Sequence, residues 1–130
     1  MNPGEKDAII RMFHVNKQYG AKKALADVTF DIHKNEFVLV TGASGAGKST
    51  LLKMLYLGEP VTGGQVLVDG MNLSRISRKR VPALRRKFGI IFQDYKLIPT
   101  KSVFDNVALV LEAAGKKQKF IEKKVNAVLR

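Results

Sequence analysis

Apolar and polar residues alternate in two adjoining stretches near the start of the chain. Residues 9–15 are mostly apolar, and in residues 25–33 apolar side chains at 28, 30 and 32 alternate with polar ones at 29, 31 and 33. A period of two is typical of a strand with one buried face. We therefore predict two strands, antiparallel to each other, with a polar loop over residues 16–23 between them.

Three further apolar runs predict strands. Residues 36–41 and 88–92 are rich in β-branched and aromatic side chains, which favours strands buried on both faces. Residues 65–69 form a shorter run that follows a loop with Gly and Pro at 58–64. Between the runs at 65–69 and 88–92 lies a segment whose apolar residues have helical spacing.

Helical spacing of apolar residues marks four segments. Residues 49–55 and 78–87 predict helices, with Pro82 tolerated only near the first turn of the second. Ser102 and Asp105 form a capping pattern before a third helix that Gly115 ends, and a fourth helix runs from residue 117. The inward faces are predicted to be Phe104, Val107, Val110, Leu111 and Ala114, then Ile121, Val125, Val128 and Leu129. This last pattern has no capping signal, so we expect a segment of a longer chain.

These elements and the amino-acid composition indicate an α/β protein with a hydrophobic core. Of the 130 residues, 45% are hydrophobic and none is Cys, which excludes a disulfide framework and a thiolate metal site. Residues 1–7 lack the apolar stretch of a signal peptide, and the longest apolar run, 107–111, is too short to cross a bilayer.

The charge is strongly positive, with 23 Lys and Arg against 11 Asp and Glu and a net charge of +12. Anionic lipid and nucleic acid are the partners that such charge allows. The helical spacing of the basic residues instead favours two solvated helix faces, and we expect no nucleic-acid partner. The two stretches comprise Arg75, Arg78, Lys79, Arg80, Arg85, Arg86 and Lys87, then Lys116, Lys117, Lys119, Lys123, Lys124 and Arg130.

The most informative motif lies between the predicted strand 36–41 and the predicted helix 49–55. Residues 42–50 fit the phosphate-binding P-loop pattern G-x-x-x-x-G-K-[ST]. Glycines let backbone N–H groups turn toward an anion, Lys48 supplies a positive charge for the β- and γ-phosphates, and the Ser49 hydroxyl is a Mg²⁺ ligand. The sequence thus predicts a nucleotide and Mg²⁺ site made of Gly42, Ala43, Ser44, Gly45, Ala46, Gly47, Lys48, Ser49 and Thr50.

Further motifs resemble those of the ATP-binding cassette (ABC) ATPases. Tyr19, ahead of the second strand, resembles the adenine-stacking aromatic of the family, residues 63–70 its antiparallel β-region, and residues 90–94 its Q-loop with Gln93. The resemblance covers residues 9–130 after a tail of residues 1–8. It implies a P-loop core with an antiparallel β-subdomain and, from about residue 102, the start of a helical subdomain.

The resemblance also implies roles and partners. Lys48 and Gln93 would be the catalytic residues, and Ser49 and Gln93 the metal ligands, with Gln93 also a hinge that senses the γ-phosphate. The full-length protein would form a homodimer around two ATP molecules at the cytoplasmic face of a bacterial inner membrane. A transmembrane subunit would provide the membrane contact. Candidates for its docking groove are Tyr95, Lys96, Leu97, Ile98 and Phe104.

The branch of the family and the activity of this segment leave alternatives. Residues 81–94 and 103–108 are most similar to the cell-division branch, and the lipoprotein-release and macrolide-export branches share much of this pattern. The signature motif, the Walker B Asp-Glu and the switch His of the family are not in the sequence. We therefore expect nucleotide binding without turnover by this segment alone. A nucleotide-sensing scaffold, a small-molecule P-loop kinase and a nucleic-acid binder are the rival interpretations.

Overall fold

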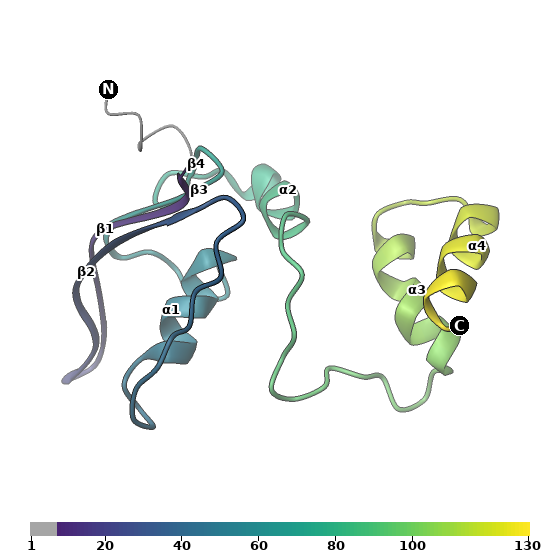
Figure 1. Cartoon of the computed structure of the whole chain (residues 1–130), viewed down its shortest axis with the longest axis horizontal. Helices are drawn as coiled ribbons and strands as arrows, with labels where there is room; N and C mark the ends of the chain where they lie inside the picture. Colours follow the sequence, from purple (N-terminus) through teal and green to yellow (C-terminus); the bar gives the residue numbers. More distant parts are fainter. Residues whose placement is uncertain (1–7) are drawn as a thin grey trace. The chain divides into compact units, whose positions relative to one another are not determined.

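A computed structural model describes residues 8–130 of the chain in two units (Figure 1). The first ends at Gly89 and the second spans Ile90–Arg130, and each is described by itself. The predicted absence of a signal peptide in residues 1–7 lies outside the described residues.

The first unit contains a four-stranded antiparallel sheet with the order β2-β1-β3-β4. The strands are β1 (Ala8–Tyr19), β2 (Lys22–His33), β3 (Gly63–Val68) and β4 (Met71–Asn72). In the central strand β1, Met12 lies opposite Phe30 of β2 on one side and Val66 of β3 on the other. The predicted antiparallel pairing of the first two strands is confirmed.

The hairpin of β1 and β2 is longer than the sequence predicts. Residues 16–23 were expected to form a loop, but Lys17 lies opposite Leu25 and Tyr19 opposite Lys22, so the turn is confined to residues 20–21. Backbone hydrogen bonds between the two strands do not depend on the polarity of the side chains, so the pairing continues into the polar residues. A bulge follows Met12 in β1, and Val15 and Lys17 are buried beyond it.

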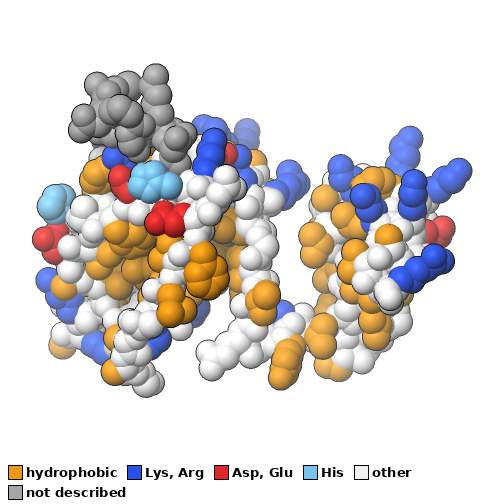
Figure 2. Space-filling view, viewed as in Figure 1, with side chains coloured by type: hydrophobic (Ala, Val, Ile, Leu, Met, Phe, Trp, Pro, Cys, Tyr) orange, Lys and Arg blue, Asp and Glu red, His pale blue; other side chains and the backbone are white. Residues whose placement is uncertain are grey.

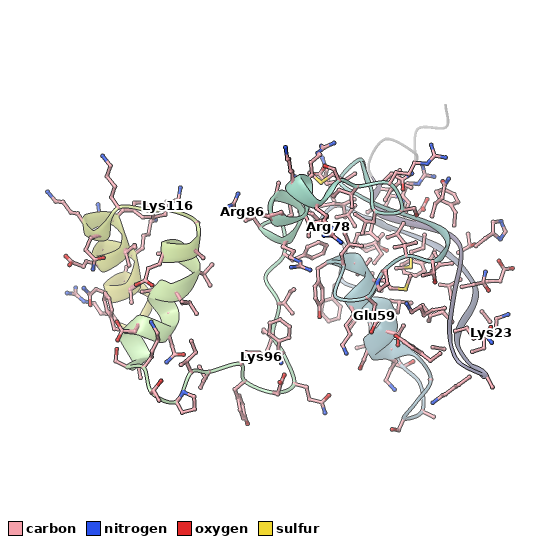
Figure 3. All side chains as sticks on the ribbon, turned by 180° about the vertical axis from the view of Figure 1, so that it is seen from behind. Lys23, Glu59, Arg78, Arg86, Lys96 and Lys116 are labelled. Carbon is pink, nitrogen blue, oxygen red and sulfur yellow. The ribbon has the colours of Figure 1, made fainter. Side chains whose placement is uncertain are left out.

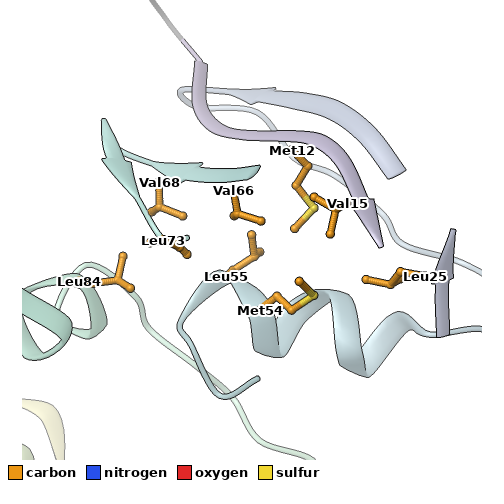
Figure 4. Close-up of a cluster of buried hydrophobic side chains, with 9 residues drawn as sticks. All are labelled: Met12, Val15, Leu25, Met54, Leu55, Val66, Val68, Leu73 and Leu84. Atoms are coloured by element: carbon orange, nitrogen blue, oxygen red, sulfur yellow. The ribbon is translucent and has the colours of Figure 1, made fainter. Parts of the chain in front are cut away.

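Helix α1 (Lys48–Leu55) packs against one face of this sheet. Met54 and Leu55 are buried and join Met12, Val15 and Val66 in one apolar cluster (Figure 4). The predicted helix 78–87 forms as two short pieces, the 3-10 helix η2 (Arg78–Arg80) and α2 (Val81–Arg85), with Pro82 at the start of α2. Leu84 of α2 completes this side of the core.

The predictions of buried strands at residues 36–41 and 88–92 are wrong for this structure. Neither segment is a strand, and Phe37, Leu39 and Ile91 are 91%, 75% and 100% exposed. A strand needs a neighbour to receive its backbone hydrogen bonds. Within residues 8–130 the sheet pairs only β1 to β4, so these apolar segments have no ladder to join.

The second unit contains α3 (Val103–Ala113) and α4 (Gln118–Val128), packed as a hairpin. The predicted cap is confirmed, because the backbone N–H of Asp105 donates to the hydroxyl of Ser102 at 3.0 Å. Gly115 then turns the chain with a φ of 70°. The small core of the unit comprises Ala108, Ile121 and Val125 with Phe104, Val107 and Leu111.

Three residues predicted to face inward in this hairpin are exposed. Val110 and Val128 are each 73% exposed and Leu129 is 46% exposed. A helix with one partner buries only a narrow stripe, and the rest of its apolar face stays in solvent. Apolar side chains are accordingly visible on the surface of the unit (Figure 2). None of the helices over the described residues 8–130 has the length and apolarity needed to cross a bilayer.

Candidate functional site

The P-loop motif folds into a turn that ends at the start of α1. Gly47 adopts a φ of 97° at the N-cap, and the N–H of Leu51 donates to its carbonyl oxygen at 2.9 Å. The first N–H groups of a helix have no carbonyl partner within the helix, and the helix dipole places partial positive charge there. The loop therefore lies at the end of α1 that favours anions.

The side chain of Lys48 bends back over this loop. Its ammonium donates to the carbonyl oxygens of Gly42 at 2.5 Å and Ala43 at 2.9 Å. A full positive charge and the amide end of α1 thus lie at the same turn. Charge-assisted hydrogen bonds of an ammonium to phosphate are stronger than neutral ones, so this arrangement suits a phosphate group.

The loop packs directly against the start of β2. A β-carbon at Gly47 would collide with the carbonyl oxygen of Ala24, and one at Gly45 would lie 3.6 Å from Nζ of Lys22. Lys22 therefore brings a second ammonium to the P-loop. Lys22 falls in residues 16–23, which were predicted to be a polar loop, and no local pattern distinguishes it from its neighbour Lys23.

Tyr19 lies at the end of β1, opposite Lys22 in the hairpin. Tyr19 is 43% exposed, and Nζ of Lys17 is 5.3 Å from the centroid of its ring. Because Lys22 also contacts the P-loop, the structure brings the hairpin end that carries Tyr19 to the same region as Lys48. The adenine-stacking role of Tyr19 stays a prediction.

Two hydroxyl residues of the motif, Ser49 and Thr50, lie in the first turn of α1, with Ser49 exposed and Thr50 half-buried. Hydroxyl and phosphate oxygens are the ligands that Mg²⁺ prefers. This arrangement fits a magnesium–nucleotide complex. Gly47 leaves no room for a β-carbon, and the Lys48 ammonium and two hydroxyl groups lie at the same loop. The metal-binding role of Ser49 stays a prediction.

Gln93 belongs to the second unit, and it is exposed there. Because each unit is described by itself, the catalytic and metal-binding roles of Gln93 stay predictions. In the same segment the ammonium of Lys96 pairs with a carboxylate oxygen of Asp94 at 2.6 Å. Tyr95 and Leu97 are 87% and 66% exposed.

Asn106 of α3 organises the chain that leads into the helix. Its side-chain oxygen accepts from the N–H of Ile98 at 2.8 Å, and its Nδ2 donates to the carbonyl oxygens of Ile98 and Lys101. Ile98 and Phe104 are half-buried. The predicted partner-binding segment is therefore part exposed surface and part local core.

Two residues of the first basic stretch make internal contacts. The Arg85 guanidinium donates to the carbonyl oxygens of Tyr56 and Leu57 at 3.1 Å each, at the end of α1. Lys87 forms an ion pair with Asp69 at 2.5 Å, and this hydrogen bond and charge lower the pKa of Asp69 below its usual value. In the view of Figure 2, most of the Lys and Arg side chains of the two-helix unit lie along its upper edge.

Comparison with known proteins identifies a family. The ABC transporter family matches residues 25–129. The cell division ATP-binding protein FtsE of Bacillus subtilis is 47% identical over 122 residues, which cover 93% of this chain and 54% of that protein. FtsE of Escherichia coli K12 is 43% identical over 122 residues, covering 93% and 55%. The chain thus spans about half the length of the curated relatives it matches.

Solved structures agree with this result. A dimeric post-hydrolysis state of the ATP-binding cassette MJ0796 bound to ADP and Pi has a TM-score of 0.80 at 28% identity, covering 91% of this chain and 54% of that one. The cbiO1 protein of Clostridium perfringens, part of an ABC transporter complex, has a TM-score of 0.79 at 28% identity, covering 95% and 49%. The predicted fold class is confirmed, and this chain belongs to the ABC transporter family, within which its relatives are ATP-binding proteins.

Proposed function

We propose that this chain binds ATP through residues 42–50 and holds the adenine ring against Tyr19. The observation that carries this proposal is the ammonium of Lys48, held over a glycine loop at the amide end of α1. Lys22 adds positive charge beside Gly45. A triphosphate carries several negative charges, and this loop has backbone amides, the positive end of a helix dipole and two lysine ammonium groups beside it.

Magnesium would accompany the nucleotide, with the Ser49 hydroxyl as a ligand; the same role for Gln93 rests on the resemblance of residues 90–94 to the Q-loop alone. When bound, the ion would neutralise part of the negative charge on the phosphates. The contribution of this chain is to bind and orient the phosphates through Lys48 and the loop amides.

In the longer protein, we propose ATP hydrolysis coupled to a membrane partner during cell division. The FtsE relatives support the cell-division branch, and the partner would be a transmembrane subunit resembling FtsX. Two copies would form a homodimer around ATP at the cytoplasmic face of the inner membrane, with membrane contact indirect through the partner. The dimeric cassettes among the similar structures support the homodimer.

Equilibrium dialysis with labelled Mg-ATP tests the site in the 130-residue chain. We expect Lys48→Ala to lower affinity at least about tenfold, because the ammonium contacts to phosphate are lost. Lys53→Ala is the matched control, since Lys53 is exposed in the last turn of the same helix. Equal ATP affinity in the Lys48→Ala variant and the parent chain would contradict the assigned site.

Phosphate release by the longer protein separates an ATPase from a non-catalytic scaffold. We expect the longer protein to release phosphate and the 130-residue chain to bind Mg-ATP without turnover. A longer protein that binds Mg-ATP and releases none would favour the scaffold.

A further inference from the structure

Lys17 has an unusual environment for a lysine. Over the described residues 8–130 it is the one charged or polar residue that is buried, with 6% of its surface exposed. Lysine is almost never buried unless its charge is paired. It follows Met12 and Val15 along β1, and both of these side chains are in the apolar core.

The Lys17 ammonium is satisfied by the loop that follows α1. It pairs with Oε2 of Glu59 at 3.3 Å and donates to the carbonyl oxygen of Pro60 at 3.3 Å. Figure 3 shows Glu59 beside α1, the helix that the P-loop precedes. Lys17 therefore ties the hairpin to the loop at the far end of the helix that the P-loop precedes.

The same ammonium lies 5.3 Å from the centroid of the Tyr19 ring. A cation within about 6 Å of an aromatic centroid is attracted to the ring. Tyr19 remains 43% exposed, so its ring is held by Lys17 and is still accessible to a ligand. One buried group thus contacts both the loop that follows α1 and the proposed base-stacking ring.

We propose that Lys17 is a positioning residue for nucleotide-base recognition, which fixes the Tyr19 ring relative to the P-loop through its contacts with Glu59 and Pro60. This inference rests on the proposed function, in which Tyr19 stacks on adenine. A buried ion pair is a weak device for stability alone, because an apolar residue of similar size often stabilises a fold equally well. An apolar side chain lacks the charge that holds both the ring and the Glu59 carboxylate.

Two ligands that differ only in the nucleoside separate base from phosphate recognition. Titration calorimetry with Mg-ATP and with Mg-tripolyphosphate is run on the parent chain, Lys17→Met, Tyr19→Ala and the double variant. We expect Lys17→Met to lower Mg-ATP affinity about five- to tenfold, in the lower range of base stacking on an aromatic ring. Tripolyphosphate affinity should stay within about twofold of the parent value. The double variant should bind Mg-ATP no more weakly than Tyr19→Ala.

Lys23→Met is the matched control, because Lys23 is an exposed lysine on β2 of the same hairpin (Figure 3). Equal losses for both ligands in Lys17→Met, or no loss for Mg-ATP while Tyr19→Ala weakens it, would overturn the inference. If the parent chain binds neither ligand, or Tyr19→Ala leaves Mg-ATP affinity unchanged, the proposed function of the site fails instead.

A second measurement needs no nucleotide. In NMR spectra of the chain with labelled tyrosine rings, Lys17→Met should move the Tyr19 signals toward those of a freely rotating ring. The signals of Tyr56 and Tyr95 should stay in place. Unchanged Tyr19 signals would overturn the positioning role. If Lys17→Met does not fold, Glu59→Gln weakens the same contact, keeps the lysine and should produce the same changes to a smaller degree.

Discussion

Gly47 lies so close to Ala24 that a β-carbon on the glycine would collide with the alanine carbonyl oxygen. Gly47 caps α1 and Ala24 belongs to β2, so this contact packs the phosphate-binding turn onto the hairpin. The φ of 97° at Gly47 is a second reason for glycine, since side chains disfavour that conformation. The shape of the site therefore depends on both a local backbone requirement and a tertiary contact.

Gly47→Ala should reduce both stability and nucleotide binding. Backbone strain at this φ costs about 1–3 kcal/mol, and the collision with Ala24 adds to it. Chemical denaturation and Mg-ATP titration measure the two effects. Gly89→Ala is the control, because a β-carbon at Gly89 would meet nothing within 4 Å. Comparable losses in the two variants would show that the Ala24 contact has no special effect.

Arg85 should stabilise the C-terminal end of the P-loop helix. Its guanidinium binds two carbonyl oxygens there, at the end of the helix dipole that favours positive charge. We expect Arg85→Ala to lower the free energy of unfolding by about 1 kcal/mol, and Arg85→Lys to recover only part of this loss. Arg86→Ala, at the exposed neighbour (Figure 3), should have a smaller effect. Denaturant midpoints that are equal for the Arg85 and Arg86 variants would contradict this role.

The pair of Asp69 and Lys87 predicts an acid dependence of stability. The pKa of Asp69 is lowered in the folded protein, so the pair stabilises the fold above the ordinary carboxyl pKa of about 4 and loses this effect as the pH falls through the lowered value. Asp69→Asn keeps a residue that tolerates the φ of 45° at this position. The difference in unfolding free energy between parent and variant should be constant near neutral pH and shrink on acidification. In a Lys87→Met background the difference should no longer vary with pH in this way.

The exposed apolar segment at residues 37–40 should be unprotected in hydrogen exchange. Its backbone is in no strand of the described residues, and its side chains are 41–91% exposed. We expect amide exchange at Val38 and Leu39 near the rates of an unfolded peptide, while Met12 in the central strand β1 is strongly protected. Strong protection of Val38 and Leu39 in the monomeric chain would contradict the exposed arrangement.

Local signals in the sequence were sufficient where neighbours along the chain supply the partners. The cap of α3 by Ser102, the turn at Gly115 and the P-loop before α1 all follow from patterns a few residues long. The contact between Lys17 and Glu59 joins residues far apart in sequence, and nothing near Lys17 indicates it. Lys22 beside Gly45 is the same kind of case.

The sequence by itself therefore determined the family, the P-loop and the type of most elements, because short patterns encode backbone preference and residue chemistry. Tertiary structure decided which apolar segments are buried, how far β1 extends and which lysines reach the site. Residues 36–41 and 88–92 have the composition of buried strands and are not strands here. A strand forms only where another strand accepts its hydrogen bonds, and that partner is a property of the fold.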